Sequence, residues 1–384
     1  MKKLISLLIV SSMLFLCFSL GTAAVNESEI EVKAKAAVLM DASTGQVLYS
    51  FNENEKLYPA SVTKIMPLLL FMEAIDSGKL SLEDKVTASA MASGKGGSQI
   101  WLKEGETMTV DELLRATAIA SANDACTALG EHIAGSETGF VKMMNDRAKE
   151  LGMVNTNFVN CSGIDDDTTE HLTTAYDIAL MSMELLSHER IKTYTTVWMD
   201  SLRGGETQLV NTNKLVRFYS GTTGLKTGTT TKAGYCLSAS AERDGLHLIA
   251  VVMGAENSTD RFEGAKAMLN WGFANFETFT PEIDSSLFDE VEIIRGVQER
   301  VRPTVTGVVP LTLRAGQKSQ LETEVDLCEN AEAPIEKNQT LGTVILKTDG
   351  NEIARYNLVS ENYVEKTNIG HIMVRFLSSL AKSA

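Results

Sequence analysis

The chain has 384 residues, of which 44% are hydrophobic and 22% are charged, and its formal net charge is −15. This length allows two or three domains with a substantial core and excludes a small single module. The excess of negative charge repels nucleic acid and anionic lipid at long range, so we expect no nucleic-acid partner.

The N-terminus has the pattern of a secretory signal peptide. Met1-Lys2-Lys3 precedes an apolar run from Leu4 to Leu20, and the small residues Gly21-Thr22-Ala23-Ala24 follow. This pattern predicts a signal peptide over residues 1–24 that is cleaved after Ala24. The run is short for a membrane span, which disfavours a retained anchor. We therefore expect an exported protein, and loss of the two lysines makes its mature charge −17.

Cysteines and histidines give no sign of a disulfide framework or a metal site. The predicted mature chain keeps Cys126, Cys161, Cys236 and Cys328, without a Cys-x-x-Cys motif or regular spacing. Their apolar neighbours favour buried free thiols. The histidines lack metal-ligand spacing, and His247 stands in an apolar run typical of a strand. We expect no metal and no organic cofactor.

Two pairs of short apolar runs, each joined by turn residues, predict two β-hairpins. The strands are Ala36–Met40 with Gln46–Tyr49, and Tyr235–Ala241 with His247–Val252. Between them, roughly residues 75–190 have helical patterns, including a capping box formed by Thr109 and Glu112. The predicted fold class is therefore α+β: an antiparallel sheet built from distant segments, with helices on it and a helical insertion.

The composition changes after a predicted helix over Arg261–Phe276. Glu277–Ser286, with Pro281, is typical of a linker. Short runs rich in Val, Thr and Ile then predict a small all-β sandwich. Its expected strands are Val291–Ile294, Gln298–Arg302, Leu311–Leu313, Thr343–Leu346 and Ile353–Leu358.

The final stretch, Glu365–Ala384, predicts an amphipathic helix. Its apolar residues fall at three- and four-residue steps: Ile369, Ile372, Met373, Phe376, Leu377 and Leu380. The apolar face could lie in a membrane interface or pack on the β domain. Basic residues are few, so any attachment to a membrane would rest on apolar burial.

Three short motifs occur in a suggestive order: Ser61-Val62-Thr63-Lys64, Ser121-Ala122-Asn123 and Lys226-Thr227-Gly228. The first two patterns also occur elsewhere in the chain, but Lys-Thr-Gly occurs once. Together the motifs can supply a nucleophile with its base, a polar pair that handles protons, and a cationic strand edge for a carboxylate. That set describes acyl transfer by an active-site serine.

Ser61 directly precedes an apolar helix predicted over Ile65–Ile75, so it is expected near a helix N-terminus, where N–H groups favour developing negative charge. Residues three apart share a helix face, which places Lys64 beside Ser61. The amine can take the hydroxyl proton if burial and nearby positive charge keep it partly neutral. Taken alone, Ser61 could be an N-cap and Lys64 a solvated lysine.

The second motif lies at a predicted break between helices Val110–Ala120 and Ala125–Ala134, which lets Ser121 and Asn123 project to the same side. Ordinary helix capping is the alternative for both residues.

The third motif is expected on the strand that borders the cleft. Gly228 has no side chain, so a substrate backbone could approach the strand edge and pair with it. Lys226 would supply positive charge, and Thr227 a hydroxyl.

The trio resembles that of the penicillin-recognising serine enzymes. Longer strings resemble the low-molecular-mass D-alanyl-D-alanine carboxypeptidases: Pro59–Lys64, Ser121–Ala125 and Leu269–Phe273. The resemblance implies a penicillin-binding-protein/β-lactamase-like catalytic domain over residues 25–277. It also implies a C-terminal β-sandwich domain over 287–363 and a membrane-anchoring amphipathic helix over 364–384.

The resemblance assigns catalytic roles to the first two motifs. Ser61 would attack the substrate carbonyl with Lys64 as its base. Ser121 would relay a proton to the leaving group, and Asn123 would hydrogen-bond the substrate backbone.

It assigns substrate binding to the third motif and its surroundings. Lys226 and Thr227 would hold the terminal carboxylate, with Arg261 as a second cation. The backbone N–H groups of Ser61 and Thr229 would form the oxyanion hole. From sequence alone, Arg261 could equally form a surface salt bridge.

Together, these expectations predict that the protein is an exported serine DD-carboxypeptidase at the outer face of the cytoplasmic membrane. It would remove the terminal D-alanine from peptidoglycan stem peptides, and β-lactams would acylate Ser61. A β-lactamase is one alternative, but no Glu-x-x-Leu-Asn string occurs and the β domain argues against it. An inactive wall-binding scaffold is another, and the three intact motifs disfavour it.

Overall fold

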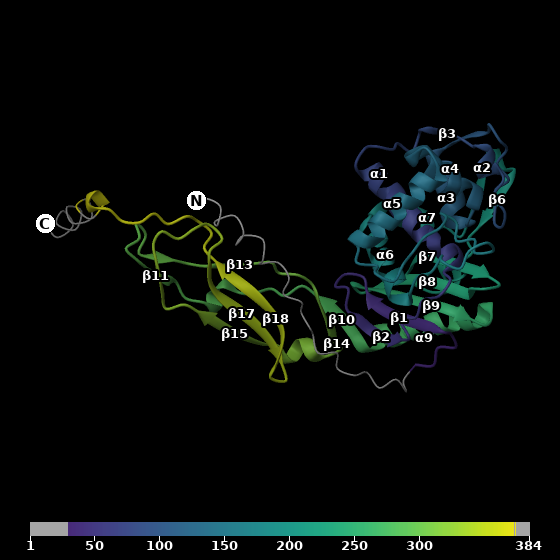
Figure 1. Cartoon of the computed structure of the whole chain (residues 1–384). Helices are drawn as coiled ribbons and strands as arrows, with labels where there is room; N and C mark the ends of the chain where they lie inside the picture. Colours follow the sequence, from purple (N-terminus) through teal and green to yellow (C-terminus); the bar gives the residue numbers. More distant parts are fainter. Residues whose placement is uncertain (1–29, 372, 374–384) are drawn as a thin grey trace. The chain divides into compact units, whose positions relative to one another are not determined.

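The computed structural model describes residues 30–371 and 373 (Figure 1). The predicted signal peptide, residues 1–24, lies outside them. Contacts divide the described residues into two units. The sheet unit comprises residues 30–284 with Gly307–Ser319, and the β unit comprises Ser285–Thr306 with the residues from Gln320 on.

A five-stranded antiparallel sheet in the order β2-β1-β9-β8-β7 forms the centre of the sheet unit. Both predicted hairpins are confirmed: β1 pairs with β2, and β8 with β9. Asp244 and Gly245, which join β8 to β9, have φ of 50° and 83°, as a type I′ hairpin turn requires. β7 stands at one edge. The strands are β1 (Ala36–Asp41), β2 (Val47–Phe51), β7 (Thr222–Thr230), β8 (Gly234–Arg243) and β9 (Leu246–Ala255).

Helices cover both faces of this sheet, which confirms the α+β class. In β1, Val38 and Met40 belong to one hydrophobic cluster, and the alternating Ala37 and Leu39 belong to another. Figure 1 shows α9 on one face of the sheet and the other long helices on the opposite face. The long helices are α1 (Ile65–Asp76), α3 (Val110–Ile119), α4 (Asn123–Ala134), α5 (Glu137–Glu150), α6 (Ala175–Ser187) and α9 (Ser258–Asn275).

The helical insertion begins with the predicted capping box. The Glu112 N–H donates to Thr109 Oγ1 at 3.1 Å, and the Thr109 N–H donates to Glu112 Oε2 at 2.8 Å. Short elements complete the sheet unit: β3 (Lys85–Thr87), α2 (Ala90–Ser93), β4 (Thr107–Thr109), α7 (Lys192–Thr195), β5 (Met199–Leu202), β6 (Thr207–Val210) and α8 (Leu215–Phe218).

The predicted linker Glu277–Ser286 is wrong at its start. β10 (Phe276–Phe279) pairs with β14 (Leu311–Arg314), so Gly307–Ser319 belongs with the sheet unit and not with the predicted β-sandwich range 287–363. Thr312 Oγ1 donates to Asp41 Oδ2 at 2.6 Å, and Thr278 Oγ1 donates to the same oxygen. A buried carboxylate on β1 thus receives two hydroxyls from segments far away in the sequence.

The β unit is an all-β domain, as predicted, with two small sheets in the orders β13-β18-β17-β15 and β12-β11-β16. Short polar strands such as β15 were not predicted, because they lack an apolar run. The strands are β11 (Val291–Ile294), β12 (Arg300–Val301), β13 (Thr304–Thr306), β15 (Glu322–Leu327), β16 (Asn330–Glu332), β17 (Thr340–Thr348) and β18 (Asn351–Val359).

Two further expectations concern thiols and the C-terminus. Cys126, Cys161 and Cys236 are buried free thiols as predicted, but Cys328 is exposed. Residues 369–371 and 373 are helical, and the rest of the predicted C-terminal helix lies outside the described residues. Among the described residues, no helix has the length and apolarity to cross a bilayer.

Candidate active site

Ser61 lies in a 3-10 turn, η2 (Ala60–Lys64), that leads directly into α1. Ala60, just before it, has φ of 49°, a left-handed conformation that costs a residue with a Cβ about 1–2 kcal/mol. Such strain persists only where the surroundings enforce it, and it is concentrated at functional sites. Here two other segments, around Gly163 and Gly228, hold the turn in place.

Lys64 contacts the predicted nucleophile. Its Nζ donates to Ser61 Oγ at 3.0 Å and to the Ser162 carbonyl at 2.8 Å. Lys64 is fully buried, and this burial lowers its pKa to about 8, against the opposing effect of Cys126, Cys161 and Asp124. An appreciable fraction of the amine is therefore neutral near physiological pH and able to accept the serine proton.

This pKa gives the acylation rate a predicted pH dependence. The neutral amine is the active form, and its fraction grows as pH rises through the pKa of about 8. The second-order rate of acylation by a reporter penicillin should therefore increase with pH, with an acidic limb centred near that value. Stopped-flow measurements from about pH 6 to 10 test this. A rate that stays flat across the range would rule out Lys64 as the titrating base.

The second motif lies where α3 gives way to α4. Ser121 has φ of 65°, and Ala122 is the N-cap of α4. Asn123 does not cap the helix, because its side-chain amide donates to the Gly96 carbonyl at 2.6 Å. Among the described residues, buried Ser121 Oγ and Asn123 Oδ1 have no hydrogen-bond partner. Unpaired buried polar atoms are costly, and a bound substrate would satisfy them.

The third motif lies on the edge strand β7, as predicted. Lys226 is buried, and its Nζ donates to the Thr227 carbonyl at 2.9 Å. Burial, together with the charges of Lys64 and Arg261, lowers the pKa of Lys226 well below its usual value. An incoming carboxylate would stabilise its ammonium form, which makes this a suitable anion site. Thr227 Oγ1 donates to Thr212 Oγ1 at 2.7 Å.

Gly228 lets the nucleophile turn approach β7 closely. A Cβ there would lie 2.6 Å from the Pro59 carbonyl oxygen and 2.9 Å from the amide nitrogens of Ser61 and Val62. The missing side chain therefore admits the backbone of η2, and pairing of a substrate backbone with the strand edge stays a prediction. This contact sets the Ser61 N–H beside the strand that carries Thr229, on adjoining segments as an oxyanion hole requires.

Arg261 supports the strands instead of lying free in the cleft. Arg261 lies in the first turn of α9, and its side chain is buried, with 7% of the residue exposed. Its Nη1 donates to the carbonyls of Gly228 and Cys236 at 3.1 and 3.3 Å, and to Thr229 Oγ1 at 3.1 Å. Within the described part of the chain no carboxylate pairs with it, so the alternative of a surface salt bridge is wrong. Contact with a substrate carboxylate stays a prediction.

A further group of residues supports Ser61 and Lys64 from behind, and no sequence pattern indicated it. Thr63 Oγ1 lies 2.8 Å from His171 Nε2, and His171 Nδ1 accepts from the Val159 N–H at 3.1 Å, so Nε2 carries the proton. Burial and the charge of Lys64 lower the pKa of His171 to about 4, which keeps the ring neutral. Ser162, the partner of Lys64, is 98 residues away in the chain. No local pattern links such distant positions. His247, in contrast, is a β9 residue as predicted.

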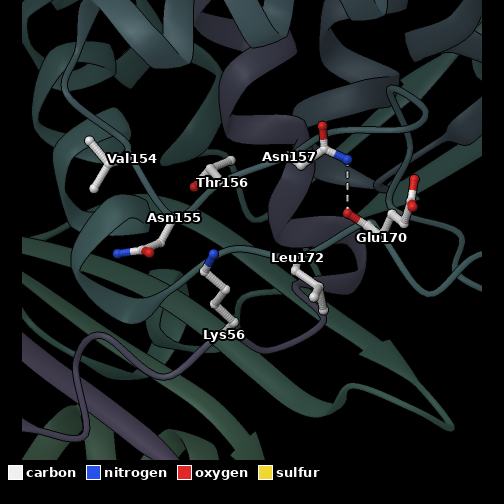
Figure 2. Close-up of a pocket in the computed structure, with 7 residues that line it drawn as sticks. All are labelled: Lys56, Val154, Asn155, Thr156, Asn157, Glu170 and Leu172. Atoms are coloured by element: carbon white, nitrogen blue, oxygen red, sulfur yellow. Dashed lines mark hydrogen bonds between the residues drawn. The ribbon is translucent and has the colours of Figure 1, made fainter.

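The sheet unit also has an open hollow of about 480 Å³ (Figure 2). Lys56, Asn157 and Glu170 are among the residues that line it, and Asn157 Nδ2 donates to the Glu170 carbonyl at 2.9 Å. This bond closes the base of the loop between α5 and α6 that carries Ser162. None of the predicted site residues lines the hollow.

Comparison with known families agrees with this geometry. Residues 22–257 match the model of peptidase family S11, the D-alanyl-D-alanine carboxypeptidases. The chain belongs to this carboxypeptidase family. Residues 276–366 match the C-terminal domain of penicillin-binding protein 5, which accounts for the β unit of a two-domain carboxypeptidase.

Individual relatives support the family assignment along the whole chain. D-alanyl-D-alanine carboxypeptidase DacF of Bacillus subtilis is 40% identical over 390 aligned positions that cover 100% of both chains. The DacC carboxypeptidase of Escherichia coli is 35% identical, covering 92% of this chain and 90% of its own.

Solved structures in the carboxypeptidase family have the same fold. Penicillin-binding protein 5 of Haemophilus influenzae superposes with a TM-score of 0.80 at 31% identity, over 88% of this chain and 98% of that one. Penicillin-binding protein D2 of Listeria monocytogenes, in its cefotaxime-bound form, reaches a TM-score of 0.59 at 33% identity. It covers 64% of this chain and 98% of its own.

Proposed function

We propose that this protein removes the terminal D-alanine from peptidoglycan stem peptides through an acyl-enzyme on Ser61. The observation that carries the proposal is the buried Lys64 amine, 3.0 Å from the Ser61 hydroxyl, beside an edge strand that bears a buried cation. Family membership supports the reaction class, the Lys64 contacts support its role as base, and the remaining roles rest on the resemblance of the three motifs.

Acylation begins with the neutral Lys64 amine, which takes the Ser61 proton while Ser61 Oγ attacks the carbonyl carbon between the two D-alanines. The N–H groups of Ser61 and Thr229 stabilise the oxyanion. The C–N bond then breaks, and the leaving amine takes a proton from the Lys64 ammonium through the Ser121 hydroxyl. Lys226 and Thr227 hold the terminal carboxylate, and Asn123 holds the substrate backbone.

Deacylation requires a water molecule to attack the ester on Ser61. We expect Lys64 and Ser121 again to accept its proton. Among the described residues, no carboxylate hydrogen-bonds Ser61 or Lys64, whereas the β-lactamase alternative needs a positioned glutamate. We therefore expect a penicilloyl ester to persist, with β-lactams acting as covalent inhibitors and not as rapidly hydrolysed substrates.

Release of D-alanine from a diacetyl-Lys-D-Ala-D-Ala peptide tests the proposed activity. The wild-type protein should release one D-alanine per peptide, and Ser61→Ala should release none above background. Ser77→Ala, a change at an exposed serine after α1, is the matched control and should keep full activity. Failure of the wild type on several stem peptides would support the inactive-scaffold alternative instead.

We also propose that the protein is exported and lies at the outer face of the cytoplasmic membrane through its C-terminal helix. The signal-like N-terminus and the exposed Ile369 and Met373 at the start of that helix support this. Truncation after Glu365 should move the protein from the membrane fraction to the soluble fraction of lysed cells without changing peptide hydrolysis. Membrane attachment that survives the truncation would contradict the proposal.

A further inference from the structure

One side chain closes the loop that contacts Lys64. Asn160, between α5 and α6, accepts at Oδ1 from the Ser162 N–H at 3.1 Å, the Ser162 hydroxyl at 3.2 Å and the Gly163 N–H at 2.7 Å. Its Nδ2 donates to the Ile164 carbonyl at 2.7 Å. The Asn160 amide thus binds the N–H groups of Ser162 and Gly163 and the carbonyl of Ile164, and so closes a five-residue turn over residues 160–164.

This turn presses its backbone against the nucleophile segment. Gly163 has φ of 86°, and a Cβ there would lie 1.9 Å from the Ala60 carbonyl oxygen. The neighbouring Ser162 carbonyl accepts from Lys64 Nζ at 2.8 Å. The position of that carbonyl relative to Lys64 therefore depends on how tightly the turn is closed.

The Ser162 carbonyl restricts where the Lys64 lone pair can point. A neutral amine has two N–H donors and one lone pair, and the lone pair must face Ser61 to take its proton. A carbonyl that accepts one N–H from a fixed direction removes the free rotation of the amine. After proton transfer, the same carbonyl accepts from the ammonium and stabilises it.

From these contacts we propose that Asn160 is a positioning residue for the reaction: by closing the turn 160–164, it aims the Ser162 carbonyl at Lys64 and thereby holds the amine toward Ser61. This inference rests on the proposed function. Among the described residues, the Asn160 side chain hydrogen-bonds Ser162, Gly163 and Ile164 and not Ser61 or Lys64, so it acts through the Ser162 carbonyl.

Asn160→Ala tests the inference with stopped-flow acylation by a reporter penicillin, which separates the acylation rate constant from the initial binding constant. We expect the rate constant per folded molecule to fall about tenfold to a hundredfold, because a misdirected base loses near-attack geometry. The binding constant should change little, since the groups proposed to bind substrate stay in place.

Asn157→Ala is the matched control. Asn157 closes the wider base of the same loop by its bond to the Glu170 carbonyl (Figure 2). Its backbone pairs with Leu172, so these hydrogen bonds do not involve residues 160–164. The control should acylate at the wild-type rate. Equal losses in the two variants would reduce the effect to general loop stability and overturn the inference. So would an unchanged rate in Asn160→Ala.

Asn160→Asp keeps the test decisive even if the alanine variant does not fold. A carboxylate preserves the acceptor contacts to Ser162 and Gly163 and adds negative charge near Lys64. Other groups act on Lys64 from two sides: Asp124 and Cys126 on α4, and Cys161 on the loop. The plateau rate at high pH should return in part, because the donor to the Ile164 carbonyl is lost, and the acidic limb of the pH profile should move to higher pH. An unmoved limb would contradict the inference.

The same experiments separate this inference from the proposed function. If wild-type protein forms no penicilloyl adduct, the proposed function fails. If the wild type reacts and both Asn160 variants react in the same way as the wild type, only the role of Asn160 fails.

Discussion

Replacing Lys64 by methionine is expected to remove most catalysis while leaving the protein at least as stable as the wild type. Without a base, acylation by penicillin should fall by about 10⁴-fold, the upper range for general base catalysis. Methionine has a similar length and fills the buried site, so the loss would come from chemistry and not from a cavity.

The expected stability follows from the sign of the pKa shift. Burial lowers the pKa of Lys64 from 10.5 to about 8, so the folded state holds an ammonium ion at a cost of about 3 kcal/mol below pH 8. This cost disappears as pH rises above 10.5, where both states are neutral. Methionine removes the cost but leaves the Ser162 carbonyl without its donor, at about 1–3 kcal/mol. The net gain at pH 7 should be about 1 kcal/mol.

Denaturant unfolding at about pH 7, beside stopped-flow acylation, measures both effects. Lys79→Met is the matched control, since Lys79 is exposed just beyond the end of α1. It should change neither quantity. A Lys64→Met protein that still acylates at more than about a tenth of the wild-type rate would exclude Lys64 as the base.

Gly163→Ala is expected to damage stability and catalysis together. The new Cβ would lie 1.9 Å from the Ala60 carbonyl oxygen and 2.8 Å from Thr63 Oγ1, on a residue with φ of 86°. The nearest atom is backbone, directly before Ser61, so relief requires that the nucleophile turn moves. Overpacking and the left-handed conformation together should cost about 2–5 kcal/mol. The acylation rate of the remaining folded protein should fall at least about a hundredfold.

Gly152→Ala separates the two causes. Gly152 has φ of 75°, but an added Cβ there meets no atom within 4 Å. It should therefore lose only the conformational part, about 1–2 kcal/mol, and should acylate normally. Denaturant midpoints and acylation rates of both variants make the comparison. Equal effects at positions 152 and 163 would mean that the close approach to Ala60 has no special role.

Local patterns predicted the parts of the fold whose causes are local. The turn at Asp244-Gly245, the capping box at Thr109 and the spacing of Ser61 and Lys64 each depend on residues within a few positions. The position of the Lys226-Thr227-Gly228 motif on an edge strand was also predicted. These features are confirmed in the structure.

The remaining features depend on contacts between distant segments. Nothing near Gly228 indicates that η2 will occupy the space of its side chain, or that Arg261 will donate to its carbonyl. In the same way, β14 belongs to the sheet unit because it pairs with β10 and because Thr312 donates to Asp41. The sequence of β14 itself does not indicate these partners. In the sequence, Asn160 has the features of an ordinary turn residue. Its proposed role depends on the contact between the Ser162 carbonyl of that turn and Lys64.

The central claim is that Ser61 is the nucleophile of this site, and intact-protein mass spectrometry after incubation with penicillin tests it most directly. We expect one penicilloyl group per chain, located on the peptide that contains Ser61, and none in a folded Ser61→Ala variant. An adduct on another residue, or no adduct on the folded wild-type protein, would contradict the account.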